Sequence, residues 1–152
     1  MAVYEDLTVI HPSGRLITVG WLGRDSNYDR GEVSTAVFAK LVDMLADPWQ
    51  PAERVGMHYC DLCRFTGGNP DLVFRGIHVR MGSANLYVPD EGCILVAPSL
   101  ILHFIDAHDY APPETFCAAV LACPPVRSPE YFRALIRGGL HDVFPNQVPT
   151  AG

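Results

Sequence analysis

Residues 84–108, ANLYVPDEGCILVAPSLILHFIDAH, contain the run of elements that decides the fold. Residues 84–88 and 93–97 are rich in apolar and β-branched side chains, which favours β-strands. The Pro-Asp-Glu-Gly between them is typical of a tight turn, because proline presets its own φ and glycine tolerates positive φ. After Pro98, apolar side chains recur at helical spacing at Leu100, Ile101, Phe104 and Ile105. We therefore expect two antiparallel strands followed directly by a helix.

The segments before this run predict more strands and one helix. Residues 72–80 form a candidate strand whose apolar and polar side chains alternate towards its end. Because Gly82-Ser83 can turn this strand into the next, the simplest sheet is an antiparallel meander. Residues 15–22 predict a further strand. Residues 33–45 have a helical apolar period, and this helix should stop before Pro48.

The segments after residue 108 predict two more helices. Pro113 opens the first, and Ser128 is a good N-cap for the second, which should end at Gly138. Strands and helices thus come in runs, so the class is α+β: a small antiparallel sheet packed against an N-terminal helix and about three C-terminal helices. We expect one domain over residues 1–144 and a flexible tail over 145–152.

The composition is that of one folded, soluble domain. The chain has 152 residues, of which 49% are hydrophobic and 18% charged. A formal net charge of −6 argues against nucleic acid as a partner and leaves room for a basic protein partner. Because residues 1–10 lack a basic start followed by an apolar run, we expect no secretory signal, and no run reaches the roughly 20 apolar residues that a membrane span needs. With an odd number of cysteines, five, we expect a reducing cytoplasmic location.

Two cysteines and two histidines have the spacing of a zinc site. Cys60 and Cys63 are separated by two residues, and His103 and His108 by four. Zn²⁺ prefers tetrahedral nitrogen and sulfur ligands, so these four side chains are the predicted ligand set. One difficulty is geometric: five residues along an ideal helix turn by about 500°, so the two imidazole rings should diverge by about 140° unless the last turn is distorted.

Other residues compete for a place in this site. His58 lies two residues before Cys60 and could replace either of the predicted histidines. The three remaining cysteines are expected to be small buried hydrophobic residues, with Cys93 the one that could still reach the metal. The Cys60–Cys63 pair could also be a redox pair, although such a pair usually follows a strand at a helix N-terminus.

The spacing favours a structural role for the zinc. A predicted meander separates the cysteine pair from the histidine pair, so the ion would clamp the turn before the sheet to the helix after it. We predict a non-enzymatic protein that acts through protein contacts, for example as an inhibitor or an immunity-like partner. One alternative is a small zinc hydrolase that uses Asp106 or Asp109 as a general base, and another is a thiol-based redox or metal sensor.

The chain also resembles a family of small uncharacterised bacterial proteins. The resemblance spans most of the chain and is carried by four segments: residues 4–8 (YEDLT), 19–22 (VGWL), 57–63 (MHYCDLC) and 97–113 (APSLILHFIDAHDYAPP). It implies a single-domain cytoplasmic protein whose family has no assigned activity. It adds no reaction and no ligand set to what the residues themselves predict.

Overall fold

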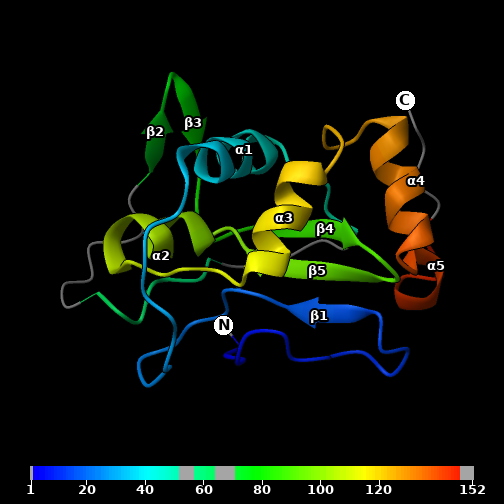
Figure 1. The fold of residues 1–152 in the computed structure, drawn as a ribbon, viewed down its shortest axis with the longest axis horizontal. Helices are drawn as coiled ribbons and strands as arrows, with labels where there is room; N and C mark the ends of the chain where they lie inside the picture. The colour runs from blue at the N-terminus through cyan, green and yellow to red at the C-terminus, as the bar shows by residue number, and fades with distance from the viewer. Residues whose placement is uncertain (1, 52–56, 64–70, 148–152) are drawn as a thin grey trace.

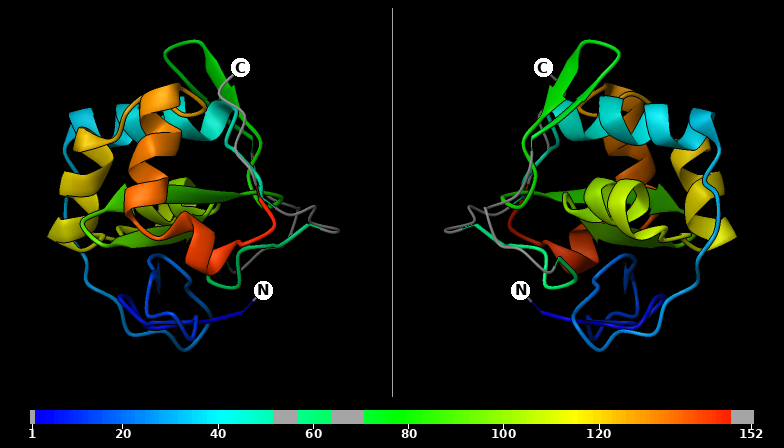
Figure 2. Two further views of the ribbon diagram at one scale, coloured as in Figure 1. Left: turned by 90° about the vertical axis from the view of Figure 1, so that its right-hand side faces the viewer. Right: turned by 90° about the vertical axis from the view of Figure 1, so that its left-hand side faces the viewer.

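The structure, a computed structural model, describes residues 2–51, 57–63 and 71–147. A three-stranded sheet lies at its centre in the order β1-β5-β4, with helices packed beside β4 and the N-terminal segment along β1 (Figure 1). A separate two-stranded hairpin, β2-β3, stands against α1 on the side away from the N-terminus (Figure 2). The α+β class is therefore confirmed.

The central sheet is mixed rather than wholly antiparallel. β4 (Asn85–Asp90) and β5 (Cys93–Pro98) form the expected antiparallel pair, joined by Glu91 and Gly92, and Gly92 has a φ of 68°. The third strand is β1 (Leu16–Thr18), which pairs with β5 in parallel. The predicted meander, with residues 72–80 next to β4, is wrong in this respect, because the third strand of the sheet is β1, which pairs with β5 and not with β4.

Residues 72–80 instead fold back on themselves. They form β2 (Leu72–Phe74) and β3 (Ile77–Val79), which pair antiparallel. Arg75 and Gly76 between them have φ values of 50° and 80°, and two successive left-handed residues give the tight turn that suits a two-residue hairpin. The Phe74 ring packs edge-on against Phe38 of α1, with ring centroids 5.1 Å apart, which fixes the hairpin to that helix.

β1 is shorter than the predicted strand 15–22. It ends before Gly20, whose φ of 80° departs from the extended backbone and whose position leaves no room for a Cβ beside Ile101. The other edge of β1 is covered by the N-terminal segment: the Leu7 N–H donates to the Thr18 carbonyl at 2.7 Å, and the Ile10 N–H to the Leu16 carbonyl at 3.0 Å. The sheet edge is therefore not open to solvent at this side.

Most helices begin and end where the sequence predicts. α1 spans Thr35–Ala46 with Ser34 as its N-cap, α3 spans Glu114–Ala122, and α4 spans Pro129–Arg137 with Ser128 as its N-cap. α2 (Ile101–His108) begins later than expected, because Pro98 is the last residue of β5 and pairs with Asn85. The four-residue α5 (Leu140–Val143) was not predicted, since so short a helix shows no period.

The hydrophobic core lies between the sheet and the helices. Leu86, Val88 and Ile94 of β4 and β5 are fully buried, as is Tyr131 of α4, whose hydroxyl donates to the Tyr87 carbonyl. None of the helices in the described part of the chain is long and apolar enough to cross a membrane. Of the predicted tail, residues 148–152 lie outside the described residues, and the domain boundary at residue 144 stays a prediction.

Candidate metal centre

α2 carries two histidines to one side of the core. Its first residues, Ile101, Leu102 and Phe104, are fully buried, and this apolar packing fixes the helix in the hydrophobic core. His103 lies among them with only 6% of its surface exposed, which is unusual for an imidazole and requires a polar partner. His108 is the last residue of the helix and is partly exposed.

The cysteine pair lies on a turn that packs against α2. Asp61 and Leu62 form the tip of this turn, and Cys60 and Cys63 flank it. The Leu62 N–H donates to the Cys60 sulfur at 3.3 Å, an interaction that stabilises a thiolate. The approach to the turn is fixed as well, since the His58 N–H donates to the Gly82 carbonyl at 2.8 Å.

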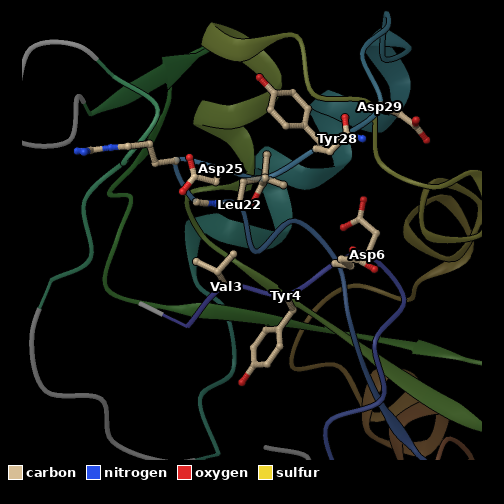
Figure 3. Close-up of a pocket in the computed structure, with 12 residues that line it drawn as sticks. Val3, Tyr4, Asp6, Leu22, Asp25, Tyr28 and Asp29 are labelled. Atoms are coloured by element: carbon tan, nitrogen blue, oxygen red, sulfur yellow. Dashed lines mark hydrogen bonds between the residues drawn. The ribbon is translucent and has the colours of Figure 1, made fainter.

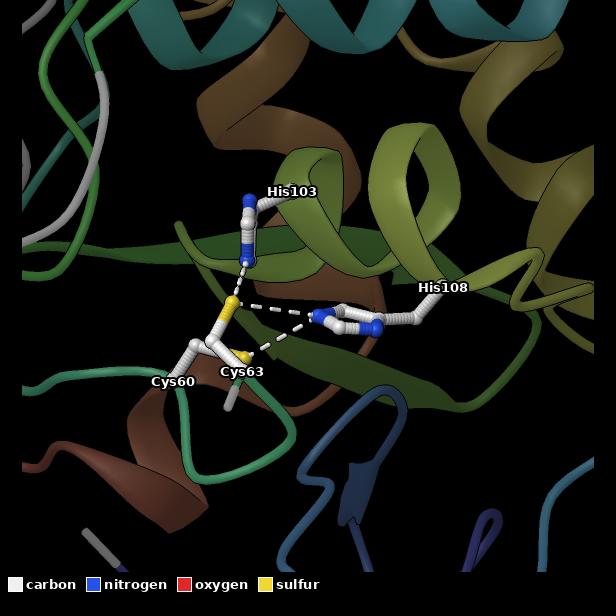
Figure 4. A group of neighbouring side chains, drawn as sticks. All are labelled: Cys60, Cys63, His103 and His108. Atoms are coloured by element: carbon white, nitrogen blue, oxygen red, sulfur yellow. Dashed lines mark hydrogen bonds between the residues drawn. The ribbon is translucent and has the colours of Figure 1, made fainter. Parts of the chain in front are cut away.

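The four predicted ligand atoms converge on one point (Figure 4). The two sulfurs and two imidazole nitrogens all lie within 4.8 Å of one another. The Cys63 Sγ is 3.2 Å from the His103 Nε2 and 3.4 Å from the His108 Nε2, and the Cys60 Sγ is 3.4 Å from the His108 Nε2. Sulfur and nitrogen bound to one tetrahedral zinc ion are about 3.5 Å apart, so a metal ion could be held here with little movement.

The imidazole rings of His103 and His108 lie close together, although an ideal helix would make them diverge. Their centroids are 5.1 Å from each other, with an angle of 82° between the ring planes. Both residues lie within α2, which ends at His108: Asp109 has a left-handed φ of 56°, and the Tyr110 N–H donates to the Phe104 carbonyl at 3.1 Å. Both histidines present their Nε2 atom to the cysteines, which leaves Nδ1 for outer contacts.

A metal ion can bind Cys60 only after the thiol of this residue has lost its proton. Burial raises the pKa of the Cys60 thiol to about 11, so without a cation this thiol stays protonated. Burial also lowers the pKa of His103, with the nearby His108 as a further cause. The pKa of His108 is lowered by burial and then by Arg30. Each of these shifts favours the uncharged form of its side chain while no metal is bound.

Three further groups that the sequence singled out lie outside this cluster. His58 is not among the residues whose ligand atoms converge. Cys93, Cys117 and Cys123 are free cysteines located in β5, in α3 and at the end of α3. The acidic candidates are all exposed on the surface near the site: Asp61, Asp106 and Asp109.

Sequence reasoning missed the residues that hold the end of α2 in place. The Tyr28 hydroxyl donates to the His108 carbonyl at 3.0 Å. The Tyr110 ring lies edge-on to that of Tyr28, and its hydroxyl donates to Asp6 Oδ2 at 2.8 Å, while Asp6 Oδ1 accepts the Gly20 N–H at 2.9 Å. Tyr28 and His108 are 80 positions apart and Asp6 and Tyr110 are 104 positions apart, so no local pattern links these partners.

Comparison with known proteins identifies a family but no function. No curated protein and no solved structure is detectably similar to this chain. Residues 2–121 match a family described as a domain of unknown function, DUF7919, and this range includes the four converging side chains. The resemblance to a family without an assigned activity is thus confirmed, while its bacterial origin stays a prediction. Since the match covers most of the residues, the chain belongs to the DUF7919 family.

Proposed function

We propose that Cys60, Cys63, His103 and His108 bind one Zn²⁺ ion, and that this zinc has a structural role. The observation that carries the proposal is the convergence of four ligand atoms within 4.8 Å from two segments that are distant in sequence. Two sulfurs and two nitrogens are the donor set that Zn²⁺ takes in tetrahedral structural sites, whereas Mg²⁺ and Ca²⁺ take oxygen ligands.

The zinc would act as a cross-link between the turn 57–63 and α2. Cys63 and His103 are 40 positions apart, with β2, β3, β4 and β5 between them. A cross-link that closes a loop of this length removes chain entropy equivalent to about 4 kcal/mol from the unfolded state. That is a large part of the stability of a typical domain, so loss of zinc would loosen the contact between this turn and the helix.

A structural zinc points to a role in binding a protein partner rather than in catalysis. Four protein ligands fill a tetrahedral shell, which leaves no position for the water that a zinc hydrolase activates. A thiol-based sensor is also less well supported, because Cys60 is only 6% exposed and its thiol pKa is raised, both of which make a poor nucleophile.

Zinc content per chain tests this proposal directly. The full chain, purified without chelator, should contain about one zinc ion, as a single four-ligand site requires. Cys63→Ser should lower zinc affinity more than about 100-fold, beyond the loss typical of outer-shell partners. Cys117→Ser is the matched control, since Cys117 is also partly buried but lies in α3, and it should keep the zinc.

Two results would overturn the proposal. One is a full chain that stays folded and takes up no zinc when Zn²⁺ is added in excess. The other is equal zinc content in Cys63→Ser and Cys117→Ser. X-ray absorption at the zinc edge would then separate a two-sulfur, two-nitrogen shell from a shell with bound water, which is the outcome that a hydrolase requires.

A further inference from the structure

A pocket of about 620 Å³ lies beside the candidate metal centre. Two segments form it, residues 3–6 and residues 22–29, with Val3, Tyr4 and Asp6 on one side and Leu22, Asp25 and Tyr28 on the other (Figure 3). Its volume is in the range of ordinary ligand pockets, and its lining residues include two aliphatic ones, Val3 and Leu22, and two tyrosines. It can therefore take up an elongated apolar group.

The charge of this pocket is strongly one-sided. Four carboxylates line it, and Arg24 is the one basic side chain that does. Asp6 already accepts hydrogen bonds at both oxygens from Gly20 and Tyr110. Glu5, Asp25 and Asp29 are exposed, and none of them forms an ion pair within the described parts of the chain. The rim therefore has negative charge without a cation partner of its own.

The wall that holds Asp25 is preformed. The Gly23 N–H donates to the Ser26 hydroxyl at 2.8 Å, and the Ser26 N–H donates back to the Gly23 carbonyl at 3.0 Å. Asp25 lies inside this closed turn, so its backbone needs little ordering when a ligand binds. Val3 lies against Gly23, 2.6 Å from where a Cβ would be, which joins the two walls closely.

We propose that this pocket binds an arginine side chain of a protein partner. An arginine has an apolar stem that suits the part of the pocket lined by Val3 and Leu22, and a planar cationic head that suits carboxylates at the rim. Tyr28 already contacts a guanidinium, that of Arg30, at 4.9 Å from its ring centroid. A chain with a net charge of −6 also attracts a basic partner over longer distances.

The pocket is connected to the candidate metal centre through Tyr28. This residue lines the pocket, and its hydroxyl donates to the carbonyl of His108. This connection rests on the proposed zinc site, whereas the pocket itself does not. If zinc holds His108 in place, it also holds the wall formed by Tyr28, so removing zinc should weaken arginine binding.

NMR titration of the full chain tests the proposal with a blocked Gly-Gly-Arg-Gly-Gly peptide as the probe. The backbone amides of Gly23, Ser26 and Tyr28 should shift and saturate with this peptide, and not with its citrulline counterpart, which has the same shape without the charge. Glu5→Gln/Asp25→Asn should weaken binding about tenfold, the sum of two exposed ion pairs. Asp43→Asn/Glu91→Gln makes the same chemical changes away from the pocket and should leave affinity within about twofold.

The outcomes separate the two proposals. Equal binding of the citrulline peptide, shifts confined to other residues, or equal loss in both double variants would overturn the arginine pocket. Zinc content is measured on the same samples. Bound zinc without arginine binding refutes the pocket alone, and arginine binding by a chain that takes up no zinc refutes the metal site alone.

Discussion

His103 illustrates how a single residue reveals the site. It lies in the first half of α2, where its neighbours Leu102 and Phe104 are fully buried and belong to the core. A buried imidazole costs free energy unless its ring nitrogens have partners, and its Nε2 has the Cys63 sulfur at 3.2 Å. An ordinary core position would favour leucine, so a histidine here indicates a chemical need.

Replacing His103 should remove the zinc and destabilise the protein. His103→Ala deletes one ligand and leaves a cavity, so we expect loss of bound zinc and a decrease of about 3 kcal/mol or more in the free energy of unfolding. His58→Ala is the comparison, since His58 lies outside the converging cluster and should retain about one zinc ion per chain. Elemental analysis and thermal unfolding check both variants. Zinc lost from His58→Ala and kept in His103→Ala would reverse the assignment.

Acid should release the metal and destabilise the metal-free protein. At neutral pH the Cys60 thiol, whose pKa is raised to about 11, is protonated, so zinc binding releases at least one proton. Zinc affinity should then decrease about tenfold for each pH unit and released proton. A pH-indicator titration counts the protons, and competition with a chelator of known affinity gives the pH dependence. Zinc binding without proton release would contradict two-thiolate ligation.

The histidines give the second part of this prediction. Their pKa values in the folded, metal-free chain lie below the ordinary value of 6.5. As the pH falls below 6.5, the unfolded chain therefore binds more protons than the folded chain does. The free energy of unfolding should decrease as the pH falls through this range. Above that pH this contribution is fully present. Chemical denaturation between pH 5 and 8 measures the slope, which should be smaller in His103→Gln.

The four candidate metal ligands could be predicted from their spacing in the sequence, whereas the residues that hold the end of α2 in place could not. A Cys-x-x-Cys turn and a His-x₄-His pair are local patterns, and both predict a zinc site because thiolate and imidazole are preferred zinc ligands. Tyr28 and Asp6 act through contacts with residues 80 and 104 positions away, so nothing near them in the sequence marks their role. Only the fold brings these tyrosine and aspartate side chains to α2.

At the scale of elements, the end of α2 controls the geometry of the cluster. His108 is the last residue of the helix, a left-handed Asp109 follows it, and Tyr28 and Tyr110 hold this end of α2 in place. Tyr110 is completely buried, and burial raises the pKa of its hydroxyl well above the usual range, so it stays a hydrogen-bond donor to Asp6.

Removing the Tyr110 hydroxyl tests how much this support contributes. Tyr110→Phe leaves the ring packed and deletes one hydrogen bond to a carboxylate, so the free energy of unfolding should decrease by about 1.5 to 3 kcal/mol. Tyr59→Phe is the matched control, because Tyr59 is 54% exposed, and its effect should be within about 0.5 kcal/mol. Urea unfolding measures both. Equal effects of the two substitutions would mean that the Asp6 bond contributes nothing.

Elements with local signals were predicted well, and the pairing of strands was not. Ser128 accepts a hydrogen bond from the N–H three residues later, which is the cap that the sequence indicates for α4. Ser34 caps α1 in the same way, although the apolar period alone predicted that helix. The β2-β3 turn was missed because Arg75-Gly76 lacks the Asn or Asp that usually marks such a turn. The parallel β1-β5 pair depends on contacts across the whole chain.

At the scale of the whole molecule, the candidate metal centre joins parts that the sheet does not. The turn 57–63 belongs to neither sheet, and its cysteines meet α2 at the cluster. The N-terminal segment reaches the same helix through Asp6 and Tyr110. The family match ends at residue 121, so α4 and α5 lie outside the part of the chain that defines the family.

Metal removal should therefore loosen one side of the molecule selectively. After zinc is removed with a chelator, we expect faster amide hydrogen exchange in the turn 57–63 and in α2, and a lower melting temperature. α4 packs on β4 and has no residue in the cluster, so its amides should keep their protection at temperatures well below melting. Exchange followed by mass spectrometry distinguishes this from uniform loosening, which would contradict a local cross-link.

The long reach of the β1-β5 pairing has a consequence for the order of events during synthesis. Leu16 pairs with Ile94, and Asp6 binds Tyr110. Leu16 and Asp6 are therefore synthesised long before the residues that they contact in the folded protein. The two cysteines likewise emerge some 40 residues ahead of His103. If the cluster binds zinc as proposed, a nascent chain presents the two cysteines to zinc first, and the ligand set is complete only after His103 and His108 have been synthesised.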